Sequence, residues 1–376
     1  MPDTHALVAT VRRTVRERGL LERGDHVVVA CSGGPDSVTM LDVLAHLAPE
    51  LGVTLHAASI DHGLRAEAAT EVEGVGRLAA ALGVPFVGLR VTVAPRPEGS
   101  LQAAARRGRY GALFELAAQH PGARRGARVA VGHTRDDQAE TVLARLLRGA
   151  GVRGLGAIVP RRADGVIRPL LDCTRAQVET YLSHRRLSAV RDPSNADRGF
   201  LRTRVRTDLL PRLLEEDPAL LGHLSDLSDE ARALTAWVDA EARALAQRAG
   251  APSADDSSDP NQGVRALVAA LGAAPEPLRR AALRVLVEGA TGRLPSRAQV
   301  EAIDRMLSRP EGDAQAREEA VRLGGGWVAR RAEEALIVRR EPDARGHADH
   351  AGPAAGGADD SEGLRRGESR PTREKQ

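Results

Sequence analysis

The residues with the clearest chemical meaning form one short stretch, Ser32-Gly33-Gly34-Pro35-Asp36-Ser37. It lies between an apolar run that predicts a buried strand and a segment with helical periodicity. Two glycines let backbone amides approach an anion closely, and a helix N-terminus adds unpaired N–H groups and partial positive charge. The two serines can donate hydroxyl hydrogen bonds, and Asp36 can hold Mg²⁺ beside a phosphate. The stretch therefore predicts a phosphate-binding loop rather than an ordinary turn with a serine cap.

A second group of candidate residues opens the predicted helix 134–148. Asp137 and Glu140 are three positions apart, so both carboxylates can face one spot near a strand edge. Thr134 and Asp137 have the spacing of a capping box, which predicts where the helix begins. The alternative is a solvated acidic first turn, which the helix dipole favours. His133, one residue earlier, can contact phosphates or transfer a proton.

Two pairs of arginines also have helical spacing. Arg106 and Arg109 are three positions apart, and Arg202 and Arg206 are four apart, so each pair can present two guanidinium groups on one helix face. Guanidinium groups bind phosphates and carboxylates through two parallel hydrogen bonds. Both pairs are candidates for binding an anion. The alternative for each is a solvent-facing arginine in an arginine-rich chain.

The pattern of hydrophobic residues along the chain predicts the fold that would position these candidate residues. Short apolar runs alternate with amphipathic segments, which predicts an α/β domain with a doubly wound, mostly parallel sheet. Asp61 and His62 follow the second strand, at the edge where ligands bind in such sheets. The expected strands are 26–31, 53–60, 84–91, 128–131 and 166–170, and the expected helices include 4–20, 65–82, 100–119, 134–148 and 174–186.

The pattern changes in the second half of the chain. Past residue 215 it is mainly helical, with a polar loop at 251–263, and three glycines at 324–326 between β-like stretches predict a hairpin. From 341 onward Leu364 is the only large aliphatic residue, so we expect a disordered tail over 341–376. We therefore expect a catalytic domain over 1–213 and a mainly helical domain over 214–340.

Composition excludes several classes of function. Of 54 basic residues in 376, the only lysine is Lys375, which removes Walker-type loops and Schiff-base enzymes. Aromatic residues make up 2%, too few for stacking platforms to be the main way of binding single-stranded nucleic acid. The net charge of +3 is compatible with an anionic partner without requiring one. Two cysteines, Cys31 and Cys173, are too few for a zinc or iron–sulfur site.

No signal-like or membrane-spanning run is visible in the sequence, so we expect a cytoplasmic protein that does not contact a membrane. The oligomeric state is open, with a homodimer as one alternative.

The glycine-rich loop resembles the Ser-Gly-Gly-x-Asp-Ser signature of the PP-loop ATP pyrophosphatases. Further motifs make residues 20–213 similar, in type and order, to the bacterial tRNA(Ile)-lysidine synthetases. Phe200 to Arg206 keeps that family's Phe-x-Arg-x-x-x-Arg frame, with Thr203 where asparagine is usual. The other matching motifs are Asp61-His62-Gly63-Leu64-Arg65, Ala105–Tyr110, Gly132–Thr141, Gly151–Gly156, Arg168-Pro169-Leu170-Leu171 and Asp192-Pro193-Ser194-Asn195.

This resemblance implies a carbon–nitrogen ligase. ATP would adenylate the C2 oxygen of the cytidine at the first anticodon position of a CAU-anticodon tRNA(Ile), with release of pyrophosphate. The ε-amine of free L-lysine would then attack C2 and expel AMP. The product reads AUA instead of AUG, and the tRNA changes its identity from Met to Ile.

The resemblance also implies a role for each of the candidate residues. Loop 32–37 and Asp61 would bind ATP, with Asp36 as a Mg²⁺ ligand, and Asp36, His133, Asp137 and Arg109 would be catalytic. The carboxylates of Asp137 and Glu140 would receive the amines of lysine, while Arg106, Arg202 and Arg206 would bind lysine, the adenylate or tRNA. Residues 214–340 would bind tRNA.

The sequence disfavours two alternatives to this function. A tRNA 2-thiolation enzyme of the same superfamily depends on cysteine pairs, whereas Cys31 and Cys173 lie far apart with no C-x-x-C. Amidating relatives need an additional glutaminase domain. A nucleotide-binding RNA adaptor without catalysis has no use for Asp36, Asp137 and Glu140 beside a phosphate loop.

Overall fold

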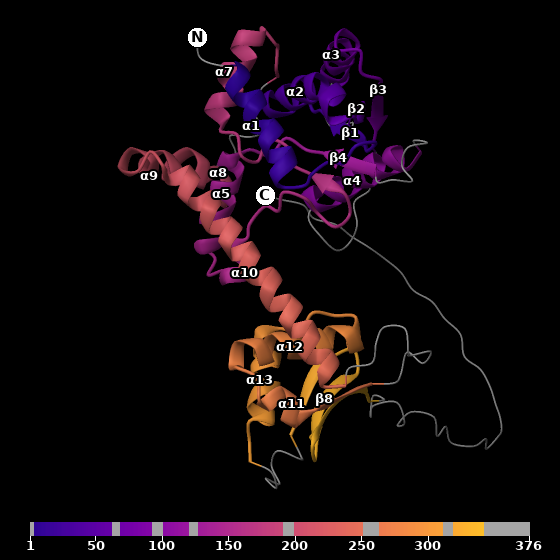
Figure 1. Cartoon of the computed structure of the whole chain (residues 1–376), viewed down its shortest axis with the longest axis vertical. Coiled ribbons are helices and arrows are strands. Elements are labelled where there is room, and N and C mark those ends of the chain that lie inside the picture. Colours follow the sequence, from indigo (N-terminus) through magenta and orange to yellow (C-terminus); the bar gives the residue numbers. More distant parts are fainter. Residues whose placement is uncertain are drawn as a thin grey trace, which may run out of the picture. The chain divides into compact units, whose positions relative to one another are not determined.

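The computed structural model describes residues 4–61, 68–91, 101–119, 127–190, 199–250, 263–310 and 319–341 (Figure 1). The chain divides into two compact units, Met1–Trp237 and Val238–Gln376, and each is described by itself. Several expectations lie outside the described residues: His62, the Asp192–Asn195 turn, the polar loop over 251–262 and the tail over 342–376.

The first unit alternates strands and helices, as the hydrophobic pattern predicts. A π-helical turn, η3, interrupts the helical segment that follows residue 200. The elements are α1 (Thr4–Glu17), β1 (His26–Ala30), α2 (Pro35–Leu51), β2 (Thr54–Asp61), α3 (Ala68–Ala81), β3 (Phe86–Arg90), α4 (Leu101–Gln119), β4 (Ala127–Ala130), α5 (Arg135–Leu146), α6 (Val152–Leu155), β5 (Val166–Ile167), α7 (Arg175–Arg185), α8 (Leu201–Arg204), η3 (Val205–Leu209), α9 (Leu210–Glu216) and the first part of α10 (Leu220–Arg248), whose residues from Val238 onward belong to the second unit.

The strands form one parallel sheet in the order β3-β2-β1-β4-β5, which confirms the predicted fold class. Side chains of β1 alternate between its faces, as in any strand buried on both sides. Val27 and Val29 belong to the core cluster that includes residues of α2 and α3, whereas Val28 packs in a separate cluster with Leu113 of α4 on the other face.

The order of the strands fixes where a ligand can bind. The chain moves outward from β1 to β3 and then returns to place β4 on the other side of β1, so the direction reverses between β1 and β4. Open α/β sheets bind ligands beside such a reversal, outside the carboxyl ends of the strands. Loop 32–37 leaves β1 at this point, and residues 131–134 leave β4. The two best sequence candidates therefore become neighbours.

Strand β5 is shorter than predicted, at Val166–Ile167 instead of 166–170. Pro169 has no N–H to donate to a ladder, so pairing ends just before it. The Arg168 N–H bonds the Pro160 carbonyl instead, at 3.0 Å. Arg168 consequently lies at the carboxyl end of β5, on the same sheet edge as the segments that follow β1 and β4.

The beginning of α10 is held to the rest of the first unit by partly buried ion pairs. The Arg18 guanidinium bonds both oxygens of Asp172, at 2.7 and 2.8 Å, and both oxygens of Asp229 on α10, at 2.8 and 2.9 Å. Arg232 pairs with the same Asp229 and donates to the Gly156 carbonyl at 2.6 Å. Burial alone would raise the pKa of Asp172, but its bonds to Arg18 bring that pKa below the ordinary value.

The second unit contains helices packed on a four-stranded antiparallel sheet in the order β6-β9-β8-β7. Gly324, Gly325 and Gly326 all have positive φ and connect β7 to β8, where the glycines predict a hairpin. Strand β9, which lies in the β-like region after the glycines, and strand β6, which the sequence pattern did not reveal, extend this hairpin into a sheet. The elements are β6 (Val264–Leu267), α11 (Val268–Gly272), α12 (Glu276–Thr291), α13 (Arg297–Leu307), β7 (Ala320–Gly324), β8 (Trp327–Ala332) and β9 (Ala335–Arg340).

None of the described helices has the length and apolar character needed to span a lipid bilayer.

Candidate functional site

Loop 32–37 is held in a closed shape by its own hydrogen bonds. The Ser37 hydroxyl donates to the Gly34 carbonyl at 2.9 Å and accepts from the Ser32 N–H at 3.1 Å. Gly33 has φ +80°, a conformation that only glycine adopts without strain. Pro35 begins α2, where a missing N–H costs nothing. The loop is thus preformed at the N-terminus of a 17-residue helix.

Asp36, in the first turn of α2, has an unusual environment. Its Oδ1 atom is buried and has no hydrogen-bond partner. Burial, followed by the nearby charge of Asp137, raises the pKa of Asp36 to about 6. A buried carboxylate in this condition favours a cation. Magnesium sites often combine one or two carboxylates with substrate phosphates, so Asp36 fits Mg²⁺ although no cluster of three or more His, Cys, Asp or Glu occurs in the described parts.

Gly132 brings the segment after β4 against this loop. A Cβ atom at position 132 would lie 3.1 Å from the Asp36 carbonyl carbon and 3.2 Å from the Ser37 nitrogen. Both neighbours are backbone atoms, which cannot rotate away. Only glycine therefore permits this approach of the two segments.

Gly132→Ala is expected to lower the free energy of unfolding by about 1–3 kcal/mol, because the added methyl group overpacks against backbone. Urea titration measures the loss. Gly111→Ala is a suitable control, since the Cβ would meet nothing within 4 Å on α4 and alanine is the better helix former. A Gly132→Ala protein as stable as the wild type would show that the two segments separate without cost.

The N-terminus of α5 forms the predicted capping box. Asp137 accepts from the Thr134 N–H through Oδ2 at 2.8 Å, and the Thr134 hydroxyl accepts from the Asp137 N–H at 3.4 Å. Asp137 Oδ2 is thereby occupied by the cap, which leaves Oδ1 to face other groups. The capping box thus orients one of the two candidate carboxylates.

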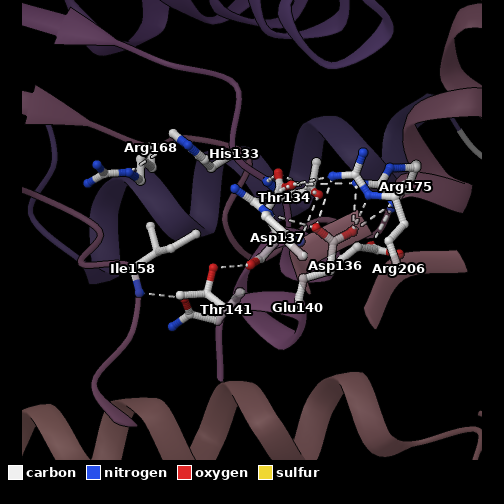
Figure 2. Close-up of polar contacts among 12 residues, drawn as sticks. His133, Thr134, Asp136, Asp137, Glu140, Thr141, Ile158, Arg168, Arg175 and Arg206 are labelled. Atoms are coloured by element: carbon white, nitrogen blue, oxygen red, sulfur yellow. Dashed lines mark hydrogen bonds and ion pairs between the residues drawn. The ribbon is translucent and has the colours of Figure 1, made fainter. Parts of the chain in front are cut away.

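Asp137 and Glu140 do face one spot, and three guanidinium groups occupy it (Figure 2). Arg202 donates to Asp137 Oδ1 at 2.8 Å and to Glu140 Oε2 at 3.0 Å. Arg206 bonds both oxygens of Glu140, at 2.6 and 2.9 Å, and Arg175 lies 3.3 Å from Oε1. We call these five residues the ionic cluster. The alternative of a solvated acidic turn is wrong, because Glu140 is fully buried and Asp137 nearly so.

The ionic cluster explains how the two arginines of the Phe-x-Arg-x-x-x-Arg frame are used. Arg202 on α8 and Arg206 on η3 both point at α5. Burial alone would raise the pKa of Asp137, but Arg202 above all, with His133, brings it below its ordinary value. Bonding to Glu140 raises the pKa of Arg206. Asp137 is therefore ionised at neutral pH, as is Arg206.

His133 lies between loop 32–37 and β5. The Arg168 Nε–H donates to its Nδ1 atom at 3.4 Å, and Figure 2 shows this pair apart from the ionic cluster. Burial, opposed by Asp137 and assisted by Arg168, lowers the pKa of His133 to about 4. His133 is consequently neutral at physiological pH. Arg168 itself is only 4% exposed.

Arg106 and Arg109 meet at the ring of Tyr110 on α4. Their guanidinium carbons lie 5.2 and 5.8 Å from the ring centroid, and that of Arg162 lies 5.3 Å from it. Burial lowers the pKa of Arg109. Three cations therefore share one aromatic ring, and among the described residues neither Arg106 nor Arg109 forms an ion pair with a carboxylate. Such an accumulation of positive charge suits an anionic ligand.

Three further residues, Asp61, Arg145 and Cys31, have contacts of their own. Asp61 ends β2 with its carboxylate 4.0 Å from Arg90 of β3, on the outer side of the sheet edge. Arg145 donates to the Gly154 carbonyl at 2.6 Å and so holds α6 to α5. The Cys31 thiol lies 3.7 Å from the Ser37 hydroxyl, behind the loop, and burial raises its pKa.

From the sequence, Arg168 is named only as part of a motif, without a role, and Arg175 is not singled out. Arg168 directly follows β5, and the same edge rule that singled out Asp61 would have found it. Arg175 is the first residue of α7, and nothing in its local pattern indicates that it reaches Glu140, which lies 35 positions earlier.

Two family models match the chain. A PP-loop domain model matches residues 6–213, and the model of a TilS substrate-binding domain matches residues 267–337. Among solved structures, the U34-tRNA thiolase NcsA from Methanococcus maripaludis is similar, with a TM-score of 0.51 and 17% identity over 60% of this chain and 79% of that one. At that identity the likeness concerns the fold alone.

Many curated proteins are similar in sequence. The tRNA(Ile)-lysidine synthase of Thermobifida fusca is 37% identical over 346 residues, which cover 90% of this chain and 98% of that protein. The tRNA(Ile)-lysidine synthase of Solibacter usitatus is 44% identical over 216 residues, 57% of this chain and 47% of that protein. The aligned part thus spans about half the length of the Solibacter protein and nearly all of the Thermobifida protein.

Proposed function

The chain belongs to the tRNA(Ile)-lysidine synthase family, and on this basis we propose that it ligates L-lysine to a tRNA at the expense of ATP. The acceptor is C2 of the cytidine at the first anticodon position of a CAU-anticodon tRNA(Ile). ATP first adenylates the C2 oxygen and releases pyrophosphate. The lysine ε-amine then attacks C2, and AMP leaves. The reaction belongs in the cytoplasm, where all three substrates occur.

The observation that carries this proposal is the arrangement at the strand reversal. A preformed lysine-free phosphate loop, an unpaired buried Asp36 oxygen and the opening of α5 all meet at the carboxyl ends of β1 and β4. Amides of loop 32–37 would bind the β- and γ-phosphates of ATP. Asp36 would hold Mg²⁺, which supplies positive charge to the phosphates when bound.

The arginines beside Tyr110 are suited to the remaining phosphate. Arg106 and Arg109 lie on α4, which packs against β1 and β4, and neither is neutralised by a described carboxylate. We assign them to the α-phosphate, where negative charge must be stabilised during AMP transfer.

The ionic cluster is suited to free lysine, which carries one carboxylate and two amines. Three guanidinium groups face two carboxylates, so the cluster has one cation in excess. Arg202 is the most exposed of the three, at 44%, and can turn away from Asp137 when an amine arrives. Asp137 and Glu140 would then receive the amines, and an arginine would receive the carboxylate.

The match of residues 267–337 to a substrate-binding domain model supports tRNA binding by residues 214–340. Whether the enzyme acts as a homodimer is a separate prediction, which light scattering of the purified protein tests.

The direct test is incubation of the protein with radiolabelled lysine, ATP and a tRNA(Ile) transcript with the CAU anticodon. We expect label in the tRNA, with AMP and pyrophosphate as products. A transcript with uridine at the first anticodon position is the matched control and should stay unlabelled. Appearance of ADP in place of AMP would contradict the assigned cleavage of ATP.

A further inference from the structure

We propose that Arg168 is a positioning residue that fixes the proton of His133 on Nε2, so that His133 acts as a hydrogen-bond donor rather than as an acid or base. This inference rests on the proposed function for its role in catalysis, whereas the state of the ring is a property of the free protein. It follows from geometry, surroundings and the way in which Arg168 is held.

The geometry determines the tautomer. A guanidinium group has N–H donors and no acceptor. Arg168 Nε lies 3.4 Å from His133 Nδ1, a long hydrogen bond, and in this contact Nδ1 can only accept. A neutral imidazole whose Nδ1 accepts carries its proton on Nε2. A doubly protonated ring would instead place an N–H and a positive charge against the guanidinium.

The surroundings keep the ring neutral. Besides its burial, His133 is near three positive groups, Arg168, Arg202 and Arg106, and one negative group, Asp137. Asp137 is already bonded to Arg202 and to the cap of α5, so its charge is largely used elsewhere. The pKa of about 4 that results puts the imidazolium form well below physiological pH. A general acid or base would need a pKa near 7.

Arg168 is held in place without a carboxylate. It is 4% exposed, its Nη1 donates to the Val159 carbonyl, and its own N–H bonds the Pro160 carbonyl. Within the part of the chain that the structure describes, no Asp or Glu lies within ion-pair distance of its guanidinium. A buried arginine is costly unless its charge and donors are used. Here the guanidinium is used to orient a histidine at the end of the neighbouring strand β4.

His133 Nε2 is then the free end of the ring. No partner for it occurs among the residues that the structure describes, and the side chain is partly exposed at the sheet edge beside loop 32–37. A fixed neutral N–H in this place suits an oxygen on which negative charge develops, since a donor that needs no reorientation stabilises the transition state most. In the proposed reaction, such an oxygen belongs to the transferred phosphate.

The first test uses the ligand-free protein. Nitrogen NMR of histidine-labelled protein distinguishes a protonated ring nitrogen from an unprotonated one, and the missing signal in His133→Gln identifies the residue among 11 histidines. We expect Nε2 protonated, Nδ1 unprotonated and no titration between about pH 5 and 8. A proton on Nδ1, or titration near pH 6.5, would overturn the proposal whether or not the enzyme makes lysidine.

Arg168→Met should release the ring in the same experiment. We expect both tautomers of His133 to be populated and its pKa to rise toward the ordinary range of histidine. Lysine incorporation should fall about 10–100-fold. Arg168→Lys keeps the charge and should keep the ring neutral. Arg161→Met, which changes an exposed arginine in the segment just before β5, is the matched control and should leave the signal of His133 unchanged.

Activity of two His133 variants gives a second test that does not depend on the folding of Arg168 variants. His133→Gln keeps an N–H donor without a titratable ring and should retain lysine incorporation within about tenfold of the wild type. His133→Ala loses the donor and should fall about 10²–10³-fold. Equal loss in both variants would show that His133 transfers a proton. Absence of incorporation in the wild type would instead reject the proposed function and leave the NMR result standing.

Discussion

Asp36→Asn is expected to abolish lysine incorporation and, at the same time, to make the ligand-free protein more stable. The variant loses the carboxylate that would hold Mg²⁺, an effect worth several kcal/mol, so the rate should fall about 10³-fold or more. It also removes a buried charge that has no hydrogen-bond partner at Oδ1. Asparagine carries no charge and so avoids the desolvation cost.

The gain in stability has a definite pH dependence. The pKa of Asp36 is about 6 in the folded protein and has an ordinary value of 3.8. A raised pKa means that the folded state prefers the protonated form, so this contribution to wild-type stability is complete below pH 3.8 and lost as the pH rises through about 6. Above pH 6 the variant should be more stable by up to about 3 kcal/mol. Urea titrations at pH 5 and pH 8, without ATP or Mg²⁺, measure the difference.

Asp226→Asn, an exposed carboxylate on α10, is the control for the loss of one negative charge and should change neither stability nor activity. Full activity of Asp36→Asn would remove Asp36 from the mechanism. Lower stability at pH 8 would show that its carboxylate already has a favourable partner in the free enzyme.

Glu140→Gln is expected to lower the free energy of unfolding by about 3–5 kcal/mol. Glu140 is fully buried and accepts from Arg202 and Arg206, so its loss leaves these partly exposed guanidinium groups with Asp137 alone. Glu50→Gln is a close control, because Glu50 also pairs with two arginines but is 38% exposed. Its loss should cost less than about 1 kcal/mol. Equal losses in the two variants would show that the ionic cluster is screened like a surface pair.

Asp137→Asn separates binding of lysine from stability within the same cluster. Its Oδ2 serves the cap of α5, which an amide oxygen can also do, while Oδ1 faces Arg202. We therefore expect a raised KM for lysine with a smaller change in kcat. Failure of adenylation with lysine binding intact would instead assign Asp137 to the nucleotide or the metal.

Most of the first unit could be predicted because its signals are local. Loop 32–37 combines a strand, two glycines and a helix start within a dozen residues, and the Thr134–Asp137 box fixes the start of α5. In both features the backbone conformation or the backbone N–H groups depend on residues only a few positions away, so a short stretch of sequence is enough to predict them. The parallel sheet could also be predicted, because its strands are apolar on both faces.

The remaining features depend on contacts between distant parts of the chain. The ionic cluster joins α5 to α7, α8 and η3, so Glu140 reads in the sequence as an ordinary acidic position although it is fully buried. The orientation of His133 depends on Arg168, 35 positions later. Strand β6 has four residues, too few to show the alternation that distinguishes a strand from a helix.

The ion pairs at the beginning of α10 have a practical consequence for the design of fragments of the protein. They join Arg18 to Asp172 and Asp229, and Arg232 to Asp229. The match to the PP-loop domain ends at residue 213, whereas Asp229 and Arg232 lie beyond it on α10. A fragment that stops at residue 213 would leave Arg18 with only one of its two acidic partners. The Gly156 carbonyl would also lose the hydrogen bond that it accepts from Arg232. The shortest autonomous piece should therefore run to about Trp237, where the compact unit ends, so that sequence homology underestimates the length needed for folding.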